Sequence, residues 1–292
     1  MVKAWWRGLG GRARLWAAVA AALLVVVVAC GVGLAAFASD FESQPGTVVT
    51  GAAEAMDRVT TEASVQRVNP GQDDLELRVW VEPHGALASS RGETPAREIE
   101  VMTPGLTGRS LVFPAGQRTG AHDLGVELAS GEFADYPFDR YTADLSFSAT
   151  AGGRPMPAEL RLDEADPLFT LHATESDGPE PGFDIVLNRS RGTFAMVGLM
   201  FVVMWVLALT VAVGALVIGG TRRGLVWPAM GWMAATLFAL AAFRNTAPGA
   251  PPIGCLLDYT AFLWAEAIVA FAVGYVVLRG TPGELRPSTE AS

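Results

Sequence analysis

The residues best placed to do chemistry in this 292-residue chain lie in the segment RNTAPGAPPIGCLLDYTAFLWAE, which covers positions 244–266. Arg244 follows one apolar run, and Asp258 and Glu266 lie within the next one. Ionisable side chains are costly inside a membrane span, so those that occur there are functional candidates by default. Because a short connector separates Arg244 from Asp258, we expect these two side chains to form an ion pair near the outer end of both runs.

Glu266 lies deeper in the same run, and it falls on roughly one helix face with Asp258 and Phe262 at i, i+4 and i+8. At about 1.5 Å per residue, it lies ~15 Å into the run, too deep to pair comfortably with Arg244. Three interpretations stay open: a protonated helix–helix hydrogen bond to a group such as Thr236, a proton or cation relay, and a polar contact between subunits.

Prolines stiffen the connector between the two runs. Pro251 and Pro252 are adjacent, and a proline inside a helix removes a backbone hydrogen bond, so neither flanking helix is expected to continue through the connector. We therefore count Pro251 and Pro252 with Arg244 and Asp258 as one candidate structural clamp.

A second candidate region is ADYPFDRYTADLSF at positions 134–147. Pro137 predicts a turn flanked by Tyr136 and Phe138, and a strand is expected to begin just after it. Asp139 is expected either to accept backbone N–H bonds from its own turn or to pair with an arginine. Arg140 is retained beside it as a candidate of undefined role.

Composition indicates a partly membrane-embedded chain, since 51% of the residues are hydrophobic and 17% are charged. A helix needs about 20 apolar residues to cross a ~30 Å hydrocarbon core. Four runs meet that test, at 15–37, 194–218, 225–243 and 256–278. We predict four transmembrane helices. The first is interpreted as an uncleaved signal anchor, with a cleaved signal peptide as the alternative.

Arginine and lysine next to the runs predict the orientation. Basic residues are found in segment 1–14, between the second and third runs, and at the start of segment 279–292. By the positive-inside rule these segments are cytoplasmic, so both termini are expected inside the plasma membrane. Segment 38–193 and the connector at 244–255 are then outside.

The outer segment has the pattern of an all-β domain. Positions 74–82 and 141–149 alternate between apolar and polar side chains, which is typical of strands with one buried face. Further strands are predicted at 59–68, 99–102, 110–113, 122–128, 158–162, 168–174 and 183–188. The predicted fold is therefore an α+β membrane protein, with an extracytoplasmic β-sandwich-like domain and four transmembrane helices.

Charge and motifs narrow the function classes. Segment 40–190 holds 26 acidic residues against 11 arginines, a net charge of −15, which disfavours nucleic acid as a partner and favours cations or basic ligands. Phosphate-binding glycine motifs and GxSxG are absent from the sequence, and the three histidines are far apart. We therefore predict a non-enzymatic protein without a metal or cofactor. Its expected partners are the lipid bilayer and an external ligand that the sequence does not identify, and homo-oligomerisation stays open.

The combination of YPFDRY, a strand running into a span, and RNTAPGAPPIG…LLDY…FLWAE resembles a family of bacterial membrane proteins numbered 4436 among domains of unknown function. The resemblance extends over about 15–279. It implies the membrane architecture but no activity.

The same features are more remotely similar to pentameric ligand-gated channels. YPFDRYTADLSF resembles their aromatic-Pro-x-Asp loop, and FDIVLNRSRGTF resembles their last outer strand entering the first channel helix. The cysteine pair that flanks the loop in those channels is absent, the order of spans is permuted, and the run at 225–243 lacks their rings of small hydroxyl residues.

Our main hypothesis is a membrane protein whose β-domain binds or senses something outside and is coupled to the helices. A channel-like or transporter subunit that uses Glu266, and an envelope scaffold or assembly factor, are the alternatives.

Overall fold

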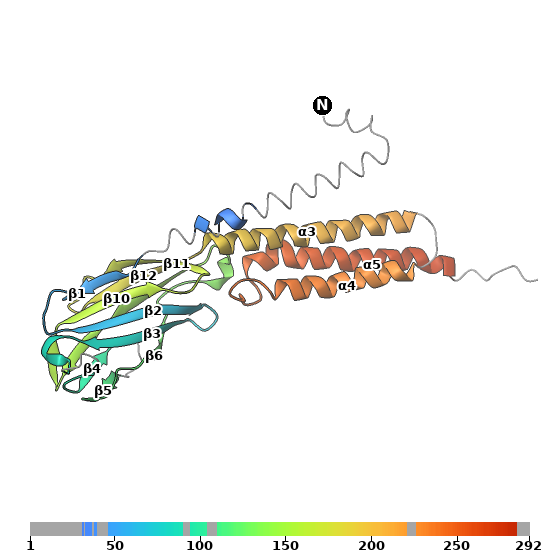
Figure 1. Cartoon of the computed structure of the whole chain (residues 1–292). Helices are drawn as coiled ribbons and strands as arrows, with labels where there is room; N and C mark the ends of the chain where they lie inside the picture. The colour runs from blue at the N-terminus through green and yellow to red at the C-terminus, as the bar shows by residue number, and fades with distance from the viewer. Residues whose placement is uncertain are drawn as a thin grey trace, which may run out of the picture.

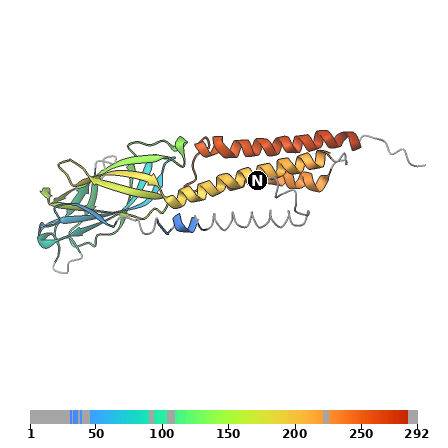
Figure 2. The same cartoon turned by 90° about the horizontal axis from the view of Figure 1, so that it is seen from above.

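The chain folds into a β-rich part and a bundle of long helices that are joined end to end (Figures 1 and 2). The computed structural model describes residues 31, 33–36, 38, 39, 46–89, 94–103, 110–220 and 226–284. Most of the predicted span at 15–37 lies outside the described residues, as do the segments 1–14 and 285–292. Where it is described, the chain at 31–39 is helical.

Strands β1–β12 form three sheets. Their bounds are β1 Val48–Gly51, β2 Val59–Asn69, β3 Asp74–Pro83, β4 Ile99–Met102, β5 Ser110–Phe113, β6 His122–Glu127, β7 Arg140–Ser146, β8 Ser148–Ala151, β9 Arg154–Met156, β10 Ala158–Glu164, β11 Phe169–Glu175 and β12 Gly182–Arg189. The strand orders are β1-β10-β2-β3-β6, β11-β12-β7 and β5-β4-β8-β9. Neighbouring strands are antiparallel, except that β10 and β2 run parallel.

One hydrophobic core joins the three sheets into a sandwich-like domain. The predicted alternation is confirmed in β3, where Leu75, Leu77, Val79 and Val81 are buried. Side chains from β2, β7, β10 and β12 complete the same core. Burial of apolar surface on this scale is the main stabilising term of the domain.

The predicted strand at 141–149 is wrong in one respect, because the chain changes sheet within it. β7 pairs with β12, whereas β8 pairs with β4 and β9. Phe147 lies between them, and its N–H donates to the carbonyl of Pro181. The alternation of buried residues continues through the break, so the sequence pattern carries no sign of the change. The short strands β1 and β9 were not predicted.

The helices are α3 Arg191–Gly220, α4 Trp227–Arg244 and α5 Leu263–Glu284, and a π-helical turn, η3 Asp258–Phe262, precedes α5. α5 packs against both α3 and α4. The buried contacts use small residues, among them Ala208 of α3 and Ala265 of α5, which let the helix axes approach closely.

Two helical segments, Arg191–Gly220 and Asp258–Thr281, are long and apolar enough to cross a membrane by length and composition alone. The prediction of four such helices is not supported beyond these two. α4 has only 18 residues and ends in Arg244, and the first predicted span lies mainly outside the described part of the chain.

The passage from sandwich to helix is very short. β12 ends at Arg189 and α3 begins at Arg191, with Ser190 as the intervening residue. The Ser190 hydroxyl accepts a hydrogen bond from the N–H of Thr193, which caps the first turn of α3. The Thr193 hydroxyl in turn donates to the carbonyl of Leu168, next to β11. These bonds fix the start of α3 to the sandwich.

Candidate functional site

Arg244 and Asp258 form the ion pair that the sequence predicts. Nε of Arg244 lies 2.7 Å from Oδ1 of Asp258, and Nη2 lies 2.8 Å from Oδ2. The two side chains are only 6% and 1% exposed. Two parallel charge-assisted hydrogen bonds of this kind are strong and hold the guanidinium in one orientation. The pair therefore locks the C-terminal end of α4 to the start of η3.

The connector folds around this ion pair. Nη1 of Arg244 donates to the carbonyl of Pro251 at 2.9 Å, and Nη2 donates to that of Pro252 at 3.0 Å. The backbone N–H of Gly254 donates to Asp258 at 2.8 Å. Pro251 and Pro252 thus supply acceptors for the buried cation, a role beyond the stiffness that the sequence suggests.

A second buried ion pair joins Asp139 to Arg189, the last residue of β12. Nη2 of Arg189 lies 2.8 Å from Oδ2 of Asp139, and neither side chain is more than 1% exposed. The Tyr141 hydroxyl also donates to Asp139 at 2.8 Å. Of the two alternatives open for Asp139, the structure has the arginine pair.

Arg189 also lies between two aromatic rings. Its guanidinium carbon is 4.2 Å from the ring centroid of Phe169 and 5.0 Å from that of Tyr136. Such cation–π contacts favour the charged guanidinium in a buried place. Nη1 of Arg189 has no hydrogen-bond partner among the described residues. It faces Gly249 of the connector, where a Cβ atom would lie 2.7 Å from it.

Tyr136 connects the two ion-paired regions. Its side chain is fully buried and packs with the core of the helical bundle, although it belongs to the loop before β7. Its hydroxyl donates to the carbonyl of Pro248 in the connector at 3.0 Å. Burial raises the pKa of the Tyr136 phenol well above its ordinary value, so the hydroxyl stays protonated and remains a donor. Tyr136 is thus a side chain of the sandwich built into the helix bundle.

These groups form one continuous cluster, which we call the junction. It consists of Tyr136, Asp139, Tyr141, Arg189, Arg244, Asp258 and the connector between Thr246 and Cys255. The β2–β3 turn also approaches it, since a Cβ at Gly71 would lie 3.4 Å from the ring of Pro252.

The other predicted residues lie apart from this cluster. Arg140 is exposed on β7. Glu266 is half-buried on α5 and makes no hydrogen bond or ion pair with any residue that the structure describes. Thr236 donates to the carbonyl of Trp232 in its own helix. The structure therefore does not bring Glu266 together with Asp258, although both belong to the same helical segment.

Sequence reasoning missed Arg189 and the part played by Tyr136. Arg189 lies just before an apolar run. An arginine in that position is usually interpreted only as a basic residue that flanks the run. A basic residue at the end of a strand, directly before a long apolar helix, is a signal that could have marked it. Tyr136 was noted only as a flank of Pro137, because no local pattern shows that it reaches the connector more than 100 positions away.

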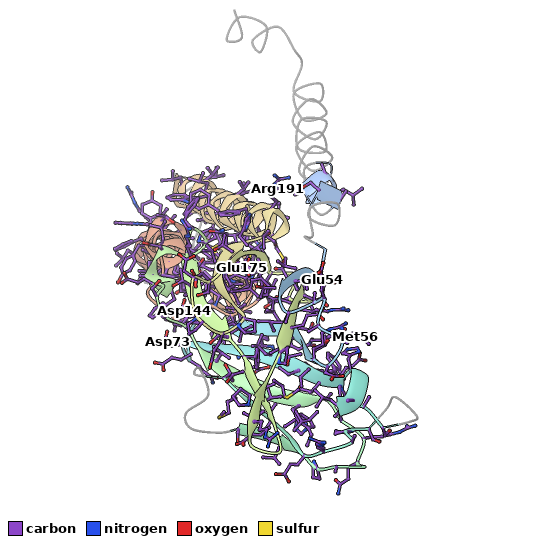
Figure 3. All side chains as sticks on the ribbon, turned by 90° about the vertical axis from the view of Figure 1, so that its left-hand side faces the viewer. Glu54, Met56, Asp73, Asp144, Glu175 and Arg191 are labelled. Atoms are coloured by element: carbon purple, nitrogen blue, oxygen red, sulfur yellow. The ribbon has the colours of Figure 1, made fainter. Side chains whose placement is uncertain are left out.

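A cleft of about 490 Å³ opens at the other end of the sandwich. It lies where β1, β8, β9, β10 and the β11–β12 loop meet. Its lining includes Thr50, Gly51, Ser148, Met156, Glu175, Glu180 and Pro181. The Thr50 hydroxyl donates to Glu175 across it. Figure 3 looks onto this end of the sandwich, where Glu54 and Glu175 are labelled. Strand β12 runs from the lip of the cleft at Gly182 to Arg189 at the junction.

Comparison with known families divides the chain at the end of β12. Residues 49–188 match the domain of unknown function DUF4436, which confirms the first resemblance for that part of the chain but not over the whole of 15–279. Residues 189–281 match a second domain of unknown function, DUF8686. YPFDRY therefore lies in the first matched region and the connector in the second, and the resemblance to pentameric channels is not supported by these matches. No curated protein matches the chain.

The connector offers a matched pair of glycines that tests its contact with Arg189. Gly249 and Gly254 both have positive φ, 73° and 104°, but a Cβ would meet Arg189 only at Gly249. We expect Gly254→Ala to cost about 1–2 kcal/mol from backbone strain. Gly249→Ala should cost at least ~1 kcal/mol more, because it also overpacks the Arg189 site. Denaturant unfolding of the two variants in detergent measures this difference, and equal costs would show that the contact is unimportant.

Proposed function

We propose that this chain, a DUF4436 domain joined to a DUF8686 domain, is a non-enzymatic protein of the plasma membrane whose outer β-sandwich binds a ligand and transmits the event to the helices. The observation that carries the proposal is the hydrogen bond from Tyr136 to the carbonyl of Pro248, inside the helical core. It is part of a junction in which charged groups of the sandwich and of the helical part are buried in two ion pairs, Asp139–Arg189 and Arg244–Asp258.

The helix surfaces support embedding in a bilayer. α3 exposes a long apolar surface that includes Leu199, Val206, Leu209, Val213 and Leu216, and α5 exposes Phe271 and Leu278. A contiguous apolar surface of this kind is unfavourable in water and marks contact with lipid or protein. We propose that α3, α4, α5 and the segment 15–37 cross the membrane, with both termini cytoplasmic and the sandwich outside.

The path for transmission is short. A ligand in the cleft would contact the β11–β12 loop, and β12 extends from that loop to Arg189. Arg189 contacts the Tyr136 ring, and Tyr136 contacts the connector that the Arg244–Asp258 pair holds in place. β12 also continues almost directly into α3. A displacement of β12 therefore acts on two helices through rigid elements.

The cleft favours a cationic ligand with an apolar body. Glu175 and Glu180 contribute carboxylates, Met156 and several prolines contribute apolar surface, and none of the described residues that line the cleft is an arginine or lysine. The net charge of −15 over 40–190 attracts cations to the whole domain. A volume of about 490 Å³ lies in the usual range for small-molecule sites.

Hydrogen–deuterium exchange of the full chain in lipid nanodiscs tests the coupling. Asp139 belongs to the sandwich and does not bond to the connector, so Asp139→Asn should speed exchange at 246–257 only if the domains are coupled. Loss of the carboxylate charge weakens the ion pair that positions Arg189. Its guanidinium can then move relative to the ring of Tyr136. We expect at least a several-fold faster exchange there, while β3 keeps its protection.

Asp123→Asn is the matched control, because Asp123 also pairs with an arginine, Arg78, but is exposed on β6. It should leave the connector unchanged. Tyr141→Phe, which removes one hydrogen bond to Asp139, is a milder variant and should give a smaller effect of the same sign. Wild-type exchange at 246–257 in both junction variants, with β3 still protected, would contradict the coupling.

The proposed orientation is tested by cysteine labelling of intact cells. A membrane-impermeant maleimide should label a cysteine placed at Ser89, which lies in the sandwich. It should label one placed at Thr221, between α3 and α4, only after permeabilisation. The wild-type chain, with its native Cys30 and Cys255, supplies the background. Labelling at position 221 but not at 89 in intact cells would reverse the topology.

A further inference from the structure

Exposed aromatic residues gather on the loop that carries Tyr136. Phe138 is 67% exposed and Phe133 is 37% exposed, although both belong to a domain with a large buried core. Between them, the fully buried Tyr136 anchors the loop to the helices. The two phenylalanines therefore project from a loop that is held in place, and Phe138 stays mostly exposed although its ring contacts Phe194.

The loop lies directly above the apolar surface of α3. The ring of Phe138 is 5.5 Å from the ring of Phe194, in the first turn of that helix. Phe194 begins a run of exposed apolar side chains that continues through Met196, Leu199 and Val202. In both Figure 1 and Figure 2 the loop lies beside the ends of the helices that face the sandwich. The exposed surface of the loop is thus continuous with that of the helix.

Exposed apolar and aromatic side chains also occur on the connector and on the helical segment that follows it. Ile253, Leu256, Tyr259 and Trp264 are all exposed, from 38% to 85%. The indole N–H of Trp264 donates to the carbonyl of Tyr259, so its one polar group is satisfied while its ring is exposed. Tyrosine and tryptophan at helix ends are typical of the interface between hydrocarbon and headgroups.

We propose that the loop at 133–138 inserts into the outer-leaflet interface, so that the β-sandwich itself contacts lipid. Phe133 and Phe138 would lie at the level of the upper acyl chains. Arg140, exposed at the start of β7, would lie among the phosphates. Since Tyr136 belongs to the same loop, a change in the lipid surface would then move a residue of the junction. The inference rests on the proposed orientation in the membrane.

Spin labels provide the test, with the full chain in nanodiscs of phosphatidylcholine and a minority of phosphatidylglycerol. Labels are placed by Phe138→Cys, by Leu209→Cys in the middle of α3, and by Val112→Cys on β5. All three native side chains are at least half exposed. Collision rates with oxygen, which concentrates in lipid, and with a polar nickel chelate, which stays in water, report the depth of each label. Wild-type protein treated in the same way corrects for Cys30 and Cys255.

We expect positions 138 and 209 to favour oxygen, with 138 shallower than 209, and position 112 to favour nickel. A label at 138 that behaves like the one at 112, while 209 remains lipid-like, would overturn the inference and leave the membrane orientation intact. Low collision rates with both reagents at 138 would show that a second copy of the chain covers the loop, which also overturns it. A water-like 209 would contradict the membrane proposal itself.

Discussion

The buried Arg244–Asp258 pair sets the shape of the junction. Both charges are removed from water, and each is satisfied only because the other and the connector backbone are in place. Removing one partner of such a pair costs about 3–5 kcal/mol, because it leaves an uncompensated buried charge. The Pro248 carbonyl belongs to the same connector, in which Arg244 also binds the carbonyls of Pro251 and Pro252. Tyr136 then has a fixed acceptor inside the helix bundle.

The Asp139–Arg189 pair plays the corresponding role on the side of the sandwich. It fixes the end of β12, which only Ser190 separates from α3, and it orients the guanidinium between the rings of Tyr136 and Phe169. The sandwich and the helical part thus meet at Tyr136, with one buried ion pair on each side of it. A relative displacement of the two parts would break the hydrogen bond from Tyr136 to Pro248 and disturb the contact between Arg189 and Gly249. Under the proposed function, these contacts would let binding at one end of the sandwich act on the helices at the other.

Local sequence patterns predict much of this fold but little of the junction. Alternation in β3 and the length of the apolar runs depend on residues that are close in sequence, so the strands and the long helices could be predicted. The Arg244–Asp258 pair could be predicted because its members are close in sequence, only 14 positions apart and joined by one proline-rich connector. Tyr136 and Pro248 are 112 positions apart, and Asp139 and Arg189 are 50 apart. Their contacts arise only when three sheets and three helices are packed together. The π-helical turn at Asp258 could not be predicted from the sequence either, since its residues are ordinary for an α-helix.

The central claim is that sandwich and bundle behave as one energetic unit through the junction. A double-mutant cycle between Asp139→Asn and Asp258→Asn, from unfolding free energies in detergent, tests it most directly. The two carboxylates belong to separate ion pairs, so they interact only through Arg189, Tyr136 and the connector. The account predicts a coupling energy of at least ~0.5 kcal/mol, while Asp123→Asn with Asp258→Asn should be additive. Additivity of the junction pair within about 0.3–0.5 kcal/mol, as for independent sites, would contradict it.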